Sequence, residues 1–182
     1  MANLIKDRTV SADPWLRLEL DAAGALPRLP ASGDVIVPLA AWQQNRPRLL
    51  ARAGRIGMWL DSDDDPAAIA EDLRLLGVVA VNFPKFTDGR GYSTGRLLRE
   101  RYGYRGELRA FGDIFRDQLL YLSRCGFDAF VLRPGEDPHA ALAAFGEFSE
   151  AYQAAVDRPV PLFRRRFFAA ADAPDWRRKR TP

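Results

Sequence analysis

From residue 34 onward, short apolar runs alternate with segments of helical spacing, and no other feature limits the possible fold as strongly. Because short loops and right-handed crossovers join such units, the pattern predicts an α/β fold with a mainly parallel sheet of about five strands and flanking helices. With 182 residues, the chain is shorter than the ~250 residues of a complete eight-fold barrel, so a partial barrel or an open sheet is expected. The predicted strands are residues 35–37, 55–60, 78–83, 107–111 and 127–132, and the predicted helices are 39–53, 65–77, 93–102, 113–126 and 137–152.

Several predicted helices carry recognisable start and stop signals. Asp65-Pro66 and Asp137-Pro138 each combine a capping carboxylate with a proline suited to the first helical position. Ser93 and Asp113 are the corresponding capping residues of two further helices. Gly77 is suited to the left-handed residue that follows a helix.

Composition divides the chain into three parts. Residues 1–33 read as an N-terminal extension with a hairpin-like pattern at 4–10, followed by a Pro- and Gly-containing linker. Residues 34–157 form the predicted α/β core domain. Residues 158–182 hold eight basic and two acidic residues, which leaves 1–157 with a net charge of −3. We expect this basic C-terminal part to be a flexible tail.

Bulk properties exclude some classes of protein. No apolar run approaches the ~20 residues of a membrane helix, and the N-terminus lacks the basic and apolar regions of a signal peptide. The single cysteine excludes an intrachain disulfide and fits a reducing compartment. We therefore expect a cytoplasmic protein with no membrane partner.

The loop after the third predicted strand has the chemistry of an anion site. Ligands of parallel α/β sheets bind at the carboxyl ends of the strands. There, glycines allow close backbone approach, a helix start offers amide groups, and arginines offer forked donors. These features predict a site for a small oxyanion or nucleotide-like ligand. The predicted ligand-binding residues are Lys85, Asp88, Gly89, Arg90, Gly91, Tyr92, Ser93, Arg96, Asp113 and Arg133.

The same residues also fit a purely structural role. The loop can be a tight turn whose arginines are neutralised by Asp88, Glu100 and Asp113, and we weigh this equally with a binding site. The glycines imitate a dinucleotide fingerprint, but five residues separate them from the strand, which disfavours that interpretation. If the protein is an enzyme, its catalytic candidates are Asp88, Tyr92 and Asp113.

No cofactor is evident from the sequence, and no metal site is predicted. One His, one Cys and scattered carboxylates give no known ligand spacing. Cys125 and His139 precede and follow the same predicted strand, so they lie at opposite ends of the sheet and cannot form a catalytic pair.

Four segments resemble a bacterial domain-of-unknown-function family, number 934. They are Phe83-Pro-Lys-Phe-Thr-Asp-Gly-Arg-Gly-Tyr-Ser93, Arg96-Leu-Leu-Arg-Glu-Arg-Tyr-Gly103, Gly106-Glu-Leu-Arg-Ala110 and Arg124-Cys-Gly-Phe-Asp-Ala-Phe130. Members of that family are typically encoded beside genes of assimilatory sulfite reduction and are often labelled as oxidoreductases of that pathway. The resemblance supplies no established catalytic residues.

What the resemblance implies is a place in sulfur metabolism. It suggests an accessory protein or oxidoreductase of sulfate assimilation and cysteine biosynthesis that binds an oxyanion or phosphate-bearing ligand at residues 85–96. The alternative is a non-enzymatic partner of sulfite reductase or another sulfur-assimilation enzyme, docking through the basic tail and Phe163, Phe167, Phe168 and Trp176. Nucleic acid is the least favoured partner.

Overall fold

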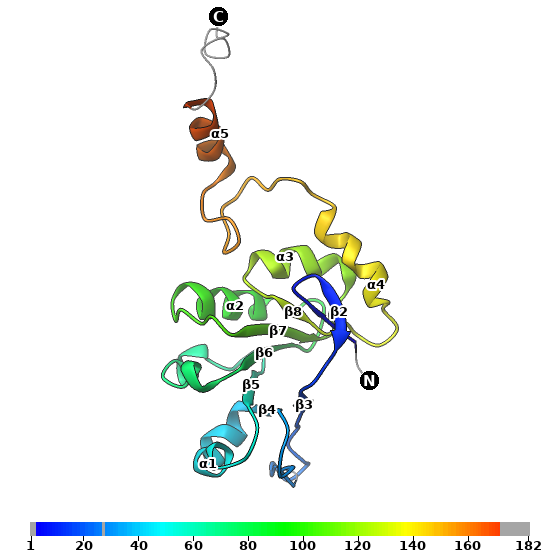
Figure 1. Ribbon diagram of the computed structural model, residues 1–182, viewed down its shortest axis with the longest axis vertical. Coiled ribbons are helices and arrows are strands. Elements are labelled where there is room, and N and C mark those ends of the chain that lie inside the picture. Colours follow the sequence, from blue (N-terminus) through cyan, green and yellow to red (C-terminus); the bar gives the residue numbers. More distant parts are fainter. Residues whose placement is uncertain (1–2, 27, 172–182) are drawn as a thin grey trace, which may run out of the picture.

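The computed structural model describes residues 3–26 and 28–171, which fold into a mixed α/β structure (Figure 1). The strands are β1 (Asn3–Lys6), β2 (Thr9–Ala12), β3 (Leu16–Arg17), β4 (Val35–Pro38), β5 (Ile56–Leu60), β6 (Val78–Phe83), β7 (Glu107–Gly112) and β8 (Ala129–Phe130). The α-helices are α1 (Leu39–Leu50), α2 (Arg90–Glu100), α3 (Leu119–Arg124), α4 (Pro138–Ala141) and α5 (Leu162–Ala171). Short 3-10 turns are η1 (Pro66–Ile69), η2 (Leu73–Leu75), η3 (Arg116–Gln118) and η4 (Leu142–Gly146).

All the strands belong to one sheet, in the order β2-β1-β8-β7-β6-β5-β4-β3. Strands β3 to β8 run parallel, and β1 pairs antiparallel both with β8 and with β2, its partner in the hairpin. The mainly parallel sheet and the hairpin are therefore confirmed. The predicted number of about five strands is too low, because the hairpin strands β1 and β2 join the same sheet and residues 16–17 add β3, which the sequence pattern does not reveal.

The short link between β2 and β3 forces the sheet to curl. These two strands lie at opposite edges of the sheet, and eight flat strands would place them about 34 Å apart. Only Asp13, Pro14 and Trp15 join Ala12 to Leu16, and this link can span at most about 15 Å. The sheet is therefore a half-barrel, one of the two predicted arrangements, with the N-terminal segment crossing its open side.

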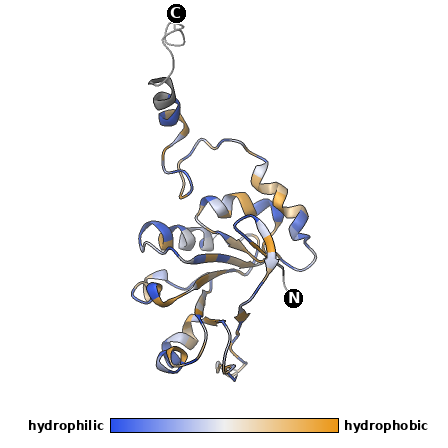
Figure 2. Ribbon diagram, viewed as in Figure 1, coloured by the Kyte–Doolittle hydropathy of each residue, from blue (hydrophilic) through white to orange (hydrophobic). Residues whose placement is uncertain are grey.

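The half-barrel buries apolar residues on both faces. On the outer face, side chains such as Val79, Val81 and Phe83 pack with the helix layer. The inner face holds a smaller cluster of Trp15, Ile36, Val78, Ala80 and Phe111. Figure 2 shows the apolar residues concentrated in the central strands, while α2 and the loops are largely hydrophilic. This two-sided burial explains why the central strands read as nearly continuous apolar runs.

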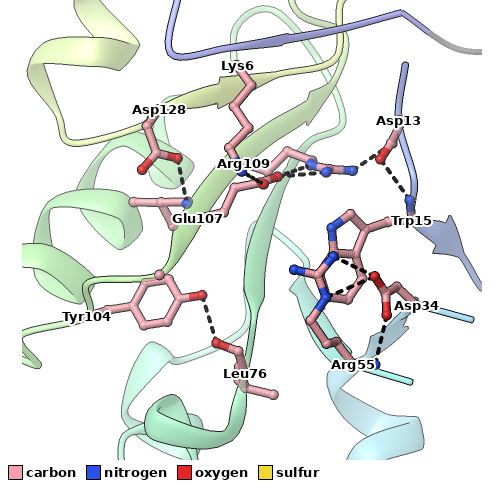
Figure 3. Close-up of polar contacts among 12 residues, drawn as sticks. Lys6, Asp13, Trp15, Asp34, Arg55, Leu76, Tyr104, Glu107, Arg109 and Asp128 are labelled. Carbon is pink, nitrogen blue, oxygen red and sulfur yellow. Dashed lines mark hydrogen bonds and ion pairs between the residues drawn. The ribbon is translucent and has the colours of Figure 1, made fainter. Parts of the chain in front are cut away.

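Buried ion pairs anchor the crossing segment to the inner face at the end where the strands begin. Arg109, only 3% exposed, binds Asp13 at 2.7 Å and Glu107 at 2.6 Å (Figure 3). Lys6 of β1 also binds Glu107, at 2.8 Å. These contacts connect β1 and the link between β2 and β3 to β7, so the N-terminal segment is fixed by charge as well as by packing.

The connection between β5 and β6 differs from the predicted helix over residues 65–77. It consists of η1 and η2 instead. Asp65 caps the first turn as predicted, through the amide of Ala67 at 2.9 Å. Asp72 is then held by two residues of α1, accepting hydrogen bonds from Trp42 at 2.7 Å and Arg46 at 2.8 Å. These tertiary contacts outweigh the helical spacing of the segment.

The last predicted helix, over residues 137–152, is also shorter than expected. Asp137 caps α4 as predicted, but α4 and η4 end at Gly146. Phe148 and Tyr152, predicted to share the core side of that helix, are 70% and 69% exposed. Beyond them the chain leads to α5, which stands apart from the sheet (Figure 1). Part of the predicted flexible tail, residues 172–182, lies outside the described residues.

Candidate functional site

The predicted anion loop joins β6 to α2, and the carboxylate of Asp88 accepts a hydrogen bond at the start of α2. α2 begins at Arg90 with Gly89 as its N-cap, three residues earlier than predicted. Ser93 therefore lies within the helix and does not cap it. The amide of Arg90 donates to the Asp88 carboxylate at 3.2 Å, which occupies a position that an anionic ligand would take at a helix start.

Arg90 is likewise engaged by its neighbours. Its guanidinium donates to the two carboxylate oxygens of Asp88 at 2.7 and 3.0 Å, and to the Ser62 hydroxyl at 2.8 Å. The hydrogen bond from Arg90 lowers the pKa of Asp88 well below its usual range, so Asp88 is ionised and a poor base at neutral pH. The predicted pairing of Asp88 with Arg90 is present, and in this conformation the pair is locally neutral.

The glycines of the helix start serve packing. A Cβ on Gly91 would lie 2.6 Å from the ring of Phe83, and one on Gly95 would lie 2.3 Å from the ring of Phe127. These two glycines are four residues apart and therefore share one helix face. They let α2 sit directly on the aromatic side chains of the sheet, which explains the G-x-x-x-G spacing without a ligand.

The remaining cations of the loop do not converge. Arg96 binds Glu100 at 2.9 Å along α2. It lies about 9 Å further along the helix axis than Arg90 and roughly 120° around it. Lys85 is exposed, with no ion pair among the described residues. The three cations predicted to form one pocket thus point to different surroundings.

Tyr92 belongs to the layer between helix and sheet. Its ring packs edge-on against Phe83 and at a tilt against Tyr121, with ring centroids 5.2 and 5.0 Å away. Gln118 donates a hydrogen bond to the Tyr92 hydroxyl at 3.1 Å. Burial raises the pKa of Tyr92, so it stays protonated at neutral pH.

Asp113 and Arg133 meet at the ends of β7 and β8, as predicted. The Asp113 carboxylate accepts the Phe86 amide at 3.1 Å and lies 3.9 Å from Arg133. It does not cap a helix. The Arg133 guanidinium sits 3.5 Å above the Phe115 ring and 3.4 Å from Glu136. Both ion-pair distances are long, so Arg133 is held mainly by stacking and its donors remain available to a ligand.

An open cavity of about 520 Å³ adjoins this cluster. Its volume lies in the range of about 300–1,000 Å³ that is typical of ligand sites. Arg17 of β3 also faces it, stacked 4.2 Å from the Phe111 ring. The lining residues are Arg17, Gly112, Val131, Leu132, Arg133, Pro134, Gly135, Glu136 and Pro138.

Arg17 was missed by the sequence reasoning. Four strands separate β3 from β8 in the sheet, so Arg17 of β3 reaches a cavity beside the end of β8 only because the sheet curls. The alternation of Trp15, Leu16, Arg17 and Leu18 is a strand signal that could have been used, but strand order is not encoded in it.

Comparison with known proteins gives a family. A family model described as "Bacterial protein of unknown function (DUF934)" matches residues 57–163, more than half of the chain. The chain belongs to this family. No curated protein and no solved structure matches it. The DUF934 match includes the predicted loop, Asp113 and Arg133, and it excludes Arg17. In the described part of the chain, no helix is both long and apolar enough to cross a membrane.

Proposed function

We propose that this protein serves assimilatory sulfite reduction in the cytoplasm, as an accessory protein or an oxidoreductase, and that it binds a sulfur oxyanion at the carboxyl ends of the strands. The pathway is suggested by the genes of assimilatory sulfite reduction beside which members of this family are typically encoded. The cavity beside Arg133 supplies the observation that carries the binding site. The proposed centre is Arg133 with Asp113, both part of the predicted ligand set.

The chemistry of this cavity suits a small oxyanion. Arg133 approaches it from the loop after β8 and Arg17 from β3, each stacked on an aromatic ring. Arg17 also binds the exposed carboxylate of Glu19 at 3.0 Å. Stacking fixes the plane of a guanidinium and leaves its N–H groups pointing sideways, where a tetrahedral or pyramidal oxyanion can accept two hydrogen bonds. Asp113 and Glu136 balance the charge when no ligand is bound.

Calorimetric titration tests this proposal. Sulfite, sulfate and adenylylsulfate are titrated separately into the full chain, into Arg133→Ala and into Arg96→Ala. Arg96 is a matched control, because it is an exposed arginine paired to one carboxylate outside the cavity. We expect binding of at least one anion to weaken about tenfold in Arg133→Ala, the loss of one charge-assisted contact, and to stay unchanged in Arg96→Ala. Absence of binding by all three anions would sink the proposal.

The second candidate is a non-enzymatic partner of sulfite reductase. It is favoured by the exposed aromatic residues that surround the start of α5: Phe163 is 55% exposed and packs on Tyr152 with ring centroids 6.5 Å apart. Phe167 and Phe168 lie further along α5, and Trp176 lies outside the described residues. Co-purification of the reductase with the full chain, but not with a chain lacking residues 158–182, would support this role. Equal recovery with both chains would exclude the tail as the contact.

A further inference from the structure

A groove of about 610 Å³ lies at the opposite end of the sheet, where the strands begin, and the proposed function does not use it. One wall is the connection between β5 and β6, and the other is the loop between α2 and β7. The lining residues are Ala70, Glu71, Leu73, Arg74, Leu76, Tyr102, Gly103, Tyr104, Arg105 and Gly106. The volume is that of a site for a small organic ligand.

Arg99 holds the second wall in one conformation. Its side chain is 9% exposed and donates to the carbonyls of Tyr104 at 2.9 Å and Gly106 at 2.8 Å. It also donates to the Gly126 carbonyl at 2.9 Å and forms an ion pair with Asp128 at 2.7 Å. A loop fixed by one buried arginine in this way is organised before any ligand arrives, which lowers the entropic cost of binding.

Tyr104 joins the two walls at the floor of the groove. Its hydroxyl donates to the carbonyl of Leu76 at 3.2 Å, as Figure 3 shows. A Cβ on Gly106 would lie 2.3 Å from that hydroxyl oxygen, so the close approach requires glycine there. The hydrogen bond from Tyr104 to Leu76 therefore fixes the distance between the two walls before any ligand binds.

Each wall carries one exposed arginine, and the first wall also carries the carboxylate of Glu71. Arg74 stands on the first wall and Arg105 on the second. Among residues 3–26 and 28–171, neither forms an ion pair, unlike Arg90 and Arg133 at the other end of the sheet. Two unpaired guanidinium groups facing one groove attract an anion and can share its oxygens.

Other residues of the groove indicate that the anion is organic. The half-buried ring of Tyr102 offers a stacking surface, and Leu73 and Leu76 give an apolar floor. Glu71 is an exposed carboxylate that would repel an isolated anion but accepts hydrogen bonds from sugar hydroxyls. The ring of Tyr102 packs partly against the core and lies 5.8 Å from the Arg101 guanidinium, which leaves only part of it open to a ligand.

We propose that this groove binds a nucleoside phosphate. Arg74 and Arg105 hold the phosphate group, Tyr102 stacks on the base and Glu71 accepts the ribose hydroxyls. The site is separate from the cavity beside Arg133. The proposal therefore stands independently of the role in sulfite reduction.

Titration of the full chain with AMP, ADP, adenosine and pyrophosphate tests the proposal by calorimetry. We expect AMP or ADP to bind, and the double variant Arg74→Gln/Arg105→Gln to weaken that binding at least about tenfold, because it removes charge-assisted contacts. Arg48→Gln is the matched control: Arg48 is also exposed and lies on α1 outside the groove. It should bind as the unmodified chain does, and so should Arg133→Ala.

A second variant separates base from phosphate. Tyr102→Leu should weaken AMP several-fold and leave pyrophosphate unchanged, since only the stacking surface is lost. The proposal is overturned if neither AMP nor ADP binds at millimolar concentration, if the double variant binds them as well as Arg48→Gln does, or if pyrophosphate binds as tightly as ADP.

Discussion

The two ends of the half-barrel use arginine in opposite ways. At the carboxyl end, exposed Arg90 is tied to the carboxylate of Asp88 at 2.7 Å, whereas Arg133 has only long contacts, 3.4 Å to Glu136 and 3.9 Å to Asp113. At the amino end, Arg109 is buried inside the barrel between Asp13 and Glu107, while Arg74 and Arg105 outside it have no ion pair in the described part of the chain.

This contrast teaches that the position of a loop in an α/β fold does not alone decide where charge is available. The general rule places ligands at the carboxyl ends of parallel strands. Here Asp88, in the loop between β6 and α2, accepts hydrogen bonds from both the guanidinium and the backbone amide of Arg90. These two donors are therefore already engaged. Whether an arginine can bind a ligand therefore depends on which carboxylates it already contacts and at what distance.

Removal of the buried arginine should have the largest effect on stability. Arg109→Ala leaves the mostly buried Asp13 without its cation and leaves Glu107, only 6% exposed, with Lys6 alone. We expect the free energy of unfolding to fall by about 3–5 kcal/mol, as for other buried pairs that lose one partner. Urea denaturation measures it. Arg90→Ala, at the other end, should cost much less because the Arg90 guanidinium is exposed to solvent; equal losses would refute the contrast.

Replacement of the loop-holding arginine should affect stability and the groove together. Arg99→Lys keeps the charge but cannot reach three carbonyls and Asp128 at once. We expect a loss of about 2 kcal/mol and weaker binding of AMP, measured by urea denaturation and calorimetry. Binding of AMP at full strength in a destabilised Arg99→Lys chain would show that the loop is not organised by this residue.

Removing the carboxylate that pairs with Arg90 should leave the carboxyl end with an exposed arginine that is open to an anion, as proposed for Arg74 and Arg105 at the amino end. Asp88→Asn removes the charge that neutralises Arg90 and the helix start. We expect sulfate affinity at this end to rise about tenfold, equivalent to about 1.4 kcal/mol, by calorimetry. Asp63→Asn is the control, since Asp63 is a nearby carboxylate with no hydrogen bond to Arg90 in the structure. An equal rise in both variants would indicate a general charge effect.

The smallest effect concerns acid titration. The hydrogen bond from Arg90 lowers the pKa of Asp88, so this pair stabilises the fold above the ordinary aspartate pKa of about 3.9 and loses its contribution as the pH falls through the lower, folded value. Following the Asp88 carboxyl by NMR should show its pKa returning upward in Arg90→Gln. An unchanged pKa would mean that Arg90 is not its partner in solution.

Much of the fold could be predicted from sequence because the central strands are buried on both faces. The runs at 35–37, 55–60 and 78–83 stand out for that reason and lie close to β4, β5 and β6. The short strands β1, β2 and β3 are only partly apolar, and their places depend on the sheet curling. The helix predicted over 65–77 failed because contacts of Asp72 with α1, far away in sequence, decide its conformation.

The candidate site was predictable only where contacts are local. Asp88 and Arg90 are two residues apart, and their pairing was among the interpretations weighed. Arg17 and the groove between Arg74 and Arg105 depend on segments that meet only in three dimensions. The packing role of Gly91 also depends on Phe83, whose orientation toward α2 no local pattern states.

Amide chemical-shift mapping by NMR tests the account most directly, with sulfate and AMP titrated separately into the full chain. We expect sulfate to shift the amide signals of residues 112–113 and 131–136, and AMP to shift those of 70–76 and 102–106. Movement of residues 85–96 by both ligands, with the two ends otherwise unchanged, would contradict it.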